Sequence, residues 1–256
     1  MLLNKKISVL YFIRQIRYQI LYIVLFAIAI GFVDMHPWLN GITIPIGIPA
    51  LLGTAVSLLL AFRSSQSYER WWEARIIWGA IVNDSRTLVR LSLQFLSKED
   101  ANQIAMRQVT WVYSLSESLR KQPFSVFVND YLEKNGIKAT NIPNALLDEH
   151  SKQIKDATSK GQVSDFGQIQ LNEIVTRLCD SMGRCERIKN TVFPRSYSVL
   201  LHTLIYVFAA MLPFGLDDEQ LLVEVILTIL IPVIFLSIEK TAIIMQDPFE
   251  NSPADT

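Results

Sequence analysis

The stretch that decides the fold of this chain occupies residues 47–75 and reads GIPALLGTAVSLLLAFRSSQSYERWWEAR. It is almost entirely apolar up to Phe62 and then becomes rich in arginine, tryptophan and serine. Glycine and proline near its start predict an irregular or kinked entry that is shielded by protein rather than by lipid. From Ala50 the helical pattern continues past Phe62 up to Gly79, so we expect a helix that crosses a membrane and continues into the aqueous phase.

Three further apolar stretches accompany this one, and half of the chain is hydrophobic. A helix of about 20 residues spans the roughly 30 Å of hydrocarbon in a bilayer. With residues 42–62, the stretches that approach this length are 20–33, 197–216 and 221–238. The first of these follows a basic segment, as in a signal peptide, but no small-residue cleavage site comes after it. We therefore predict four transmembrane helices.

The distribution of positive charge predicts the orientation of these helices. Of the 24 Lys and Arg residues, four precede the first stretch, 19 lie from Arg63 to Arg195, and Lys240 follows the last stretch. The positive-inside rule then places both termini and the long middle region in the cytoplasm, as in a multi-pass protein of the inner (plasma) membrane. The two short outer connections instead carry acidic residues, namely Asp34, Asp217, Asp218 and Glu219.

The predicted division of the chain follows from this topology. Residues 1–62 hold the N-terminal segment and the first two spans, residues 63–196 form a cytoplasmic helical domain, residues 197–240 hold the last two spans, and residues 241–256 form a cytoplasmic tail. In the middle domain, turn signals separate helices expected at residues 64–97, 98–121, 125–134, 144–158 and 168–189. The fold class is therefore an all-α membrane protein.

Composition and motifs argue against several functions. Lys and Arg balance Asp and Glu at 24 each, which gives no indication of a nucleic-acid partner. The two cysteines and three histidines are scattered, so no metal site, disulfide framework or catalytic triad is indicated. There is no phosphate-binding glycine loop, and we expect neither a cofactor nor enzymatic activity. A membrane-anchored scaffold that uses its cytoplasmic helices for docking stays open as an alternative.

An aromatic and basic cluster follows the span 42–62. Its members are Arg63, Tyr68, Arg70, Trp71, Trp72 and Arg75. In one interpretation these side chains lie at the level of the lipid headgroups, where tryptophan and arginine are common. In the other they support a pore and the contacts between subunits. Composition does not distinguish an anchor from a pore.

Several segments, in order along the chain, together resemble the bacterial branch of the bestrophin family. They are GIPALLGTA at 47–55, FRSSQSYERWWEAR at 62–75, GRCERI at 183–188, LPFG at 212–215 and QDPF at 246–249. The resemblance implies a homopentamer that contacts membrane lipid, with its second spans lining a central pore for small ions. It also implies that the long helices continue into a cytoplasmic vestibule.

The resemblance further implies which residues narrow the pore. In the family a hydrophobic neck is formed by residues at i, i+4 and i+8, which here are Thr54, Leu58 and Phe62. Helical spacing independently places these three on one face, where they could instead pack within one subunit. A second constriction, the cytoplasmic aperture, would lie at Phe166, with Asp165 beside it.

The ion that such a pore would conduct is predicted from its charges. Animal bestrophins bind calcium beside the Asn-Pro-Phe motif, but the tail after Phe249 holds only two carboxylates, too few for a calcium site by itself. The acidic outer connections predict a modest preference for monovalent cations. The alternative is a chloride or other anion channel of the same architecture. Arg63 should point away from the axis, whereas Arg70 could face it and favour anions.

Overall fold

The computed structural model describes residues 13–34, 44–191, 193–216 and 221–250, and within them it contains helices and no strand. An all-α fold, as predicted, is therefore confirmed for this part of the chain. The elements are α2 (Arg17–Asp34), α3 (Gly47–Phe95), α4 (Lys98–Leu119), α5 (Val126–Lys134), α6 (Ile142–Ser159), α7 (Asp165–Asn190), α8 (Arg195–Met211), the short 3-10 helix η1 (Pro213–Gly215) and α9 (Leu221–Gln246).

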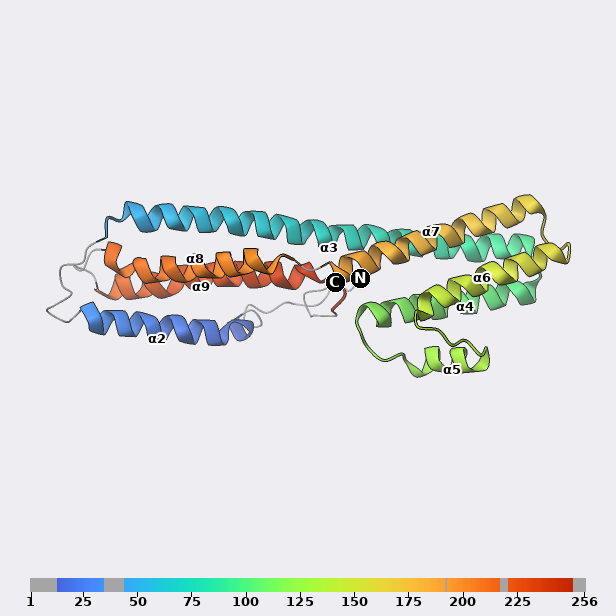
Figure 1. Ribbon diagram of the computed structural model, residues 1–256, viewed down its shortest axis with the longest axis horizontal. Coiled ribbons are helices and arrows are strands. Elements are labelled where there is room, and N and C mark those ends of the chain that lie inside the picture. The colour runs from blue at the N-terminus through green and yellow to red at the C-terminus, as the bar shows by residue number, and fades with distance from the viewer. Residues whose placement is uncertain (1–12, 35–43, 192, 217–220, 251–256) are drawn as a thin grey trace. The chain divides into compact units, whose positions relative to one another are not determined.

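Helix α3 continues past the expected span, as the pattern after Ala50 predicted. Most of the expected span 42–62 and of the expected helix 64–97 forms one uninterrupted helix of 49 residues, and Gly79 does not break it (Figure 1). A glycine in a helix interior costs about 1 kcal/mol relative to alanine, which the many neighbouring helix-forming residues offset. The chain separates into two compact units, and α3 contributes its first part to one and its second part to the other.

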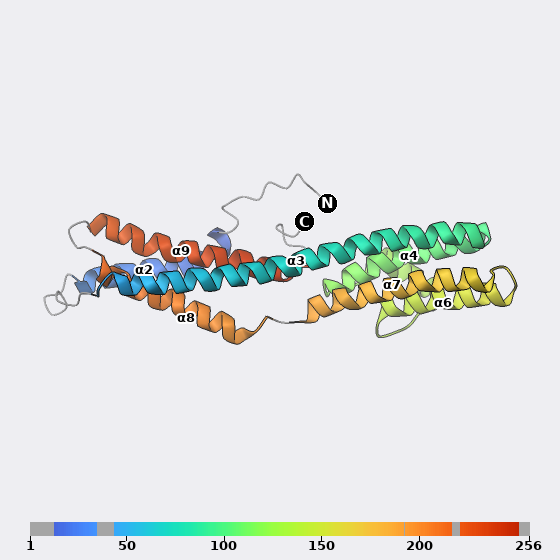
Figure 2. The ribbon, with the colours of Figure 1, turned by 90° about the horizontal axis from the view of Figure 1, so that it is seen from above.

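The first unit comprises residues 1–71, 192–246 and 252–256 and contains α2, the start of α3, α8 and α9. In Figures 1 and 2, α2 and α8 lie against α9. Their shared core holds apolar side chains from all four helices, namely Ile23, Val56, Leu60, Leu201, Ile205 and Leu236. At Gly53 a Cβ atom would lie only 3.0 Å from the Phe208 ring, so glycine allows α3 and α8 to approach each other closely.

Two helices of the described residues are long and apolar enough to cross a membrane, Gly47–Phe95 and Val223–Gln246. A third candidate arises if α7 and α8 are taken as one broken span, and Arg17–Ile30 is apolar but shorter. The four crossings predicted above therefore stay a prediction. Large apolar side chains are exposed along these helices, for example Leu25 at 54% and Leu51 at 73%, which suits contact with lipid or with another subunit.

The second unit comprises residues 72–191 and 247–251 and contains the rest of α3 with α4, α5, α6 and α7. Its core is formed by fully buried side chains of α3, α4, α6 and α7, among them Ile77, Leu88, Ile104, Trp111, Leu146, Ile154, Leu171 and Leu178. Three of its helices begin with a side-chain cap: Ser97, Asn141 and Ser164 each accept a hydrogen bond from a backbone N–H of the first turn. Such caps stabilise a helix by about 1 kcal/mol each.

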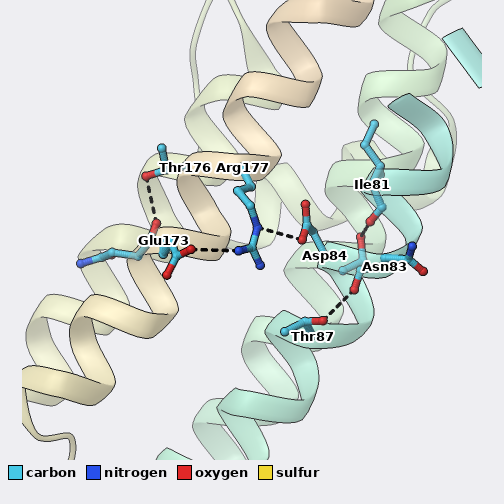
Figure 3. A network of polar contacts seen from close by, with 9 residues as sticks. Ile81, Asn83, Asp84, Thr87, Glu173, Thr176 and Arg177 are labelled. Atoms are coloured by element: carbon cyan, nitrogen blue, oxygen red, sulfur yellow. Dashed lines mark hydrogen bonds and ion pairs between the residues drawn. The ribbon is translucent and has the colours of Figure 1, made fainter. Parts of the chain in front are cut away.

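A polar network at the surface of this unit joins α3 to α7 (Figure 3). The guanidinium of Arg177 donates through Nε to Asp84 on α3 at 3.0 Å and through Nη1 to Glu173 on its own helix at 3.0 Å. Ser and Thr hydroxyls nearby donate to carbonyls of their own helices, as Thr87 does to Asn83. Because Arg177 is 44% exposed, solvent screens these ion pairs and they add little to the stability of the unit.

The segment after α9 belongs to the second unit by its contacts. Asp247 forms an ion pair with Lys189, and its Oδ1 accepts a hydrogen bond from the backbone N–H of Phe249. The Phe249 ring packs against the core of the unit. The Asp-Pro-Phe motif therefore serves here as a structural attachment to α7.

A buried polar contact lies between α4 and α6. Arg107 Nη1 donates to the Glu149 carbonyl at 3.0 Å and to Gln153 Oε1 at 2.9 Å, and it lies 3.5 Å from His150 Nδ1. The two hydrogens of Arg107 Nη1 serve the two shorter hydrogen bonds, and His150 Nδ1 lies beside the guanidinium charge. Burial, together with the Arg107 charge, lowers the pKa of His150 to about 3.

This contact predicts acid sensitivity. In the unfolded chain His150 titrates near a pKa of about 6.5. Between that pH and the folded pKa of about 3, the unfolded state binds more protons. The contribution of neutral His150 to the free energy of unfolding is therefore complete above pH 6.5. It decreases as the pH falls, by up to about 1.4 kcal/mol per pH unit. We expect His150→Gln to flatten the decrease in melting temperature between pH 6.5 and 4.5. Parallel curves for the two proteins would contradict this origin of the sensitivity.

Candidate functional site

The side chains predicted to form the neck lie on one exposed face of α3. Leu58 is 57% exposed and Phe62 is 59% exposed, and Thr54 is exposed as well. The opposite face of the same turns is buried, with Val56 at 0% and Leu60 at 2%. Within one chain the neck face thus packs against no core, and it is open to a pore, to lipid or to a second subunit.

The hydroxyl of Thr54 adds little polarity to the neck face. Its Oγ1 donates to the carbonyl of Ala50, one turn earlier, at 2.8 Å. The hydroxyl proton is therefore used within the helix, and the oxygen keeps only acceptor capacity. The face formed by Thr54, Leu58 and Phe62 is mostly apolar.

Directly after Phe62, Arg63 turns to the buried side of α3. Its Nη1 donates to Glu239 Oε1 of α9 at 2.7 Å, and both side chains are 2% exposed. The second oxygen of Glu239 lies 2.8 Å from His202 Nε2 of α8. The Arg63 guanidinium also lies over the Phe193 ring, 5.1 Å from its centroid. One buried carboxylate thus links three helices of the first unit.

Arg70 is likewise engaged with α9. Its Nε donates to the carbonyl of Gln246 at 3.2 Å, and the side chain is half-buried. The rings of Tyr68 and Trp71 are in contact, with centroids 5.8 Å apart and an interplanar angle of 32°. Trp72 is 47% exposed and Arg75 is half-buried. Arg70 therefore lies off the neck face, since the twelve residues from Leu58, the middle residue of that face, turn the helix about 120° beyond three full turns.

Sequence reasoning overlooked Glu69. This exposed carboxylate follows Phe62 by seven residues, a spacing that returns the helix to within about 20° of the same direction. The seven-residue interval was the available signal.

The predicted aperture residues lie at the start of α7. Asp165 and Phe166 are both exposed, and at 81% Phe166 is the most exposed large apolar side chain in the described part of the chain. The turn before them is held by Ser164, whose Oγ accepts from the Gly167 N–H at 3.2 Å. An aromatic ring so exposed has nothing within its own unit to cover it.

Of the predicted outer charges, Asp217, Asp218 and Glu219 lie outside the described residues, as does the side chain of Asp34. In the residues that the structure describes, no group of three or more His, Cys, Asp or Glu side chains could hold a metal ion. Cys185 is fully buried, and burial raises the pKa of its thiol to about 12, so this cysteine is unreactive.

Comparisons with known proteins agree with the motif pattern. The family model described as "Bacterial/Fungal Bestrophin protein" matches residues 6–256. The voltage-dependent anion channel-forming protein YneE of Escherichia coli K12 is 32% identical over 232 residues, which cover 88% of this chain and 76% of that protein. A similarly named protein of Ralstonia nicotianae is 27% identical over 214 residues, covering 80% of this chain and 70% of its own length.

Solved structures show the same fold. The crystal structure of a bacterial bestrophin homologue from Klebsiella pneumoniae, phased by Zn-SAD, superposes with a TM-score of 0.83 at 28% identity and covers 93% of this chain and 90% of its own. A crystal structure described as that of a membrane protein gives a TM-score of 0.85 at 27% identity, covering 94% and 92%.

The buried ion pair yields a prediction about stability. Glu239→Leu leaves the Arg63 charge buried without its carboxylate, which should cost about 3–5 kcal/mol. Adding Arg63→Met removes that uncompensated charge, so the double variant should regain part of the lost stability. The melting temperatures of the wild type, the single variant and the double variant are compared by thermal unfolding in detergent. As a control, Glu149→Gln removes a solvent-screened ion pair with Lys152 and should leave the melting temperature nearly unchanged. Equal losses in the single and double variants would show that the two groups are not coupled.

Proposed function

The chain belongs to the bestrophin family, in its bacterial and fungal branch, and on this premise we propose that it is one subunit of a homopentameric ion channel. The observation that carries the proposal is the exposed face of α3 formed by Thr54, Leu58 and Phe62. Five such faces around an axis would form an apolar neck. The exposed Phe166 would form a second, cytoplasmic constriction with Asp165 beside it.

The location in the membrane is supported by the charge pattern. We place α2, the first part of α3, α8 and α9 in the inner membrane, with both termini and residues 63–196 on the cytoplasmic side. The absence of Lys and Arg from the two short connections, 34–40 and 217–220, supports this orientation. The second unit, with its own apolar core, is consistent with a cytoplasmic domain.

An apolar neck acts on ions through dehydration. Leu58 and Phe62 offer no oxygen that could replace an ion's hydration shell, so this part of the pore resists all ions and discriminates weakly by charge. The conducted species are then small monovalent ions. No bond is made or broken, so no catalytic residue is assigned.

For the sign of the ion, the comparisons favour the alternative over the first expectation. The modest cation preference predicted from the acidic connections finds no support among the relatives, several of which are named as anion channel-forming proteins. We therefore assign anions such as chloride as the permeant ions. Of the acidic residues on which the cation prediction depended, Asp217, Asp218 and Glu219 lie outside the described part of the chain, as does the side chain of Asp34.

Replacing the apolar neck should raise conductance. Leu58→Ala with Phe62→Ala widens the constriction, so the single-channel conductance of purified protein in planar bilayers should increase. The matched control is Leu60→Ala on the buried face of the same turn, which should lower stability by about 2–5 kcal/mol without raising conductance. A stable pentamer with unchanged conductance would remove these residues from the pore, and a protein without any pore would be the scaffold considered above.

The reversal potential under a potassium chloride gradient tests the permeant ion. An anion channel should reverse toward the chloride equilibrium potential. Reversal near the potassium equilibrium potential would contradict the assignment of anions and restore the cation preference predicted from the sequence.

A further inference from the structure

The neck face of α3 continues beyond Phe62 to a carboxylate. Each residue of an α-helix turns about 100° and rises about 1.5 Å, so Glu69 lies about 20° off the direction of Phe62 and about 10 Å further along the axis. Glu69 is exposed, as are Ser65 and Gln66 between the two. The first charged side chain in line with the neck is therefore acidic.

The carboxylate of Glu69 is held by neutral donors of the preceding turn. Ser65 Oγ donates to Glu69 Oε1 at 3.4 Å, and Gln66 Nε2 donates to Glu69 Oε2 at 3.3 Å. At these lengths the hydrogen bonds are weak, but both come from side chains on the same exposed face. They orient the carboxylate without neutralising its charge.

The two nearby arginines are directed elsewhere. Arg63 is neutralised by Glu239 on the buried side of the helix. Arg70 donates to the Gln246 carbonyl, about 100° around the helix from Glu69. The two arginines nearest to Glu69 in the sequence are thus both held against α9.

From this arrangement we propose that Glu69 is a selectivity-determining residue of the pore. In an assembly whose neck is formed by this face of α3, one copy from each subunit forms a ring of carboxylates beside the neck, and this ring opposes the passage of anions. The inference rests on the proposed function, because without a pore there is no axis for Glu69 to face. On this proposal, Glu69 repels chloride more strongly than any other described residue of the neck face.

The expected size of the effect follows from Coulomb's law. In water, one charge between about 4 and 8 Å from a permeating ion changes the ion's local concentration about two- to sixfold, before salt screening. Removing the charge while keeping the shape should therefore raise the permeability of chloride relative to potassium by about twofold.

The test uses the full chain, purified and reconstituted in planar bilayers under a potassium chloride gradient. Glu69→Gln should move the reversal potential toward the chloride equilibrium value. Gln66→Glu, which adds a carboxylate one turn nearer the neck, should move it in the opposite direction. The control Glu133→Gln neutralises an exposed carboxylate on α5 and should leave the potential unchanged.

The outcomes separate this inference from the proposed function. If Leu58→Ala with Phe62→Ala raises conductance but Glu69→Gln leaves the permeability ratio unchanged, the pore stands and the role of Glu69 is refuted. The same conclusion follows if Glu133→Gln shifts the ratio as much as Glu69→Gln does. If neither the neck substitutions nor Glu69→Gln alters the current, the face does not line a pore, and both proposals fail.

Discussion

The buried ion pair between Arg63 and Glu239 is the interaction on which the arrangement of the first unit depends. A charge that is 2% exposed is tolerated only when an opposite charge meets it at close range, and Arg63 has one such carboxylate at 2.7 Å. This requirement fixes the rotation of α3 about its axis. Once Arg63 points toward α9, helical geometry directs Phe62 about 100° and Leu58 about 140° away from it, where no core of the same chain covers them.

The same carboxylate limits how the other helices can move. Because Glu239 also contacts His202, a rotation of α8 or α9 would separate a buried charge from one of its partners. The Phe193 ring over Arg63 and the bond from Tyr197 Oη to the Leu59 carbonyl, at 2.7 Å, add directional contacts at the same level. The helices are thus held together by polar geometry at this level and by apolar packing elsewhere, as around Gly53.

The sequence predicted the helices well because their signals are local. The apolar run up to Phe62 and the helix-forming residues after it are sufficient to predict α3, and turn residues such as Gly136 and Gly161, which adopt positive φ, mark the ends of other helices. Partners distant in the sequence could not be predicted in this way. Glu239 lies 176 residues from Arg63, and no local pattern shows which cation a buried carboxylate meets.

The candidate site shows the same division. The spacing of Thr54, Leu58 and Phe62 predicted a common face, but only the structure shows that this face is exposed and that the face of Leu60 is buried. For Arg70, the position on the helix does not decide where the long side chain points. Its hydrogen bond to the Gln246 carbonyl shows that it turns toward α9. If this face lines a pore, Leu58 and Phe62 supply no coordinating atoms, so ion preference would arise from charges that lie in line with the face and have no ion pair. Arg63 is paired with Glu239 and Arg70 lies off the face, whereas Glu69 is in line with it and has no ion pair among the described residues. In the proposed pore this face of α3 would therefore disfavour anions, and a preference for anions would come from positive charges on other elements.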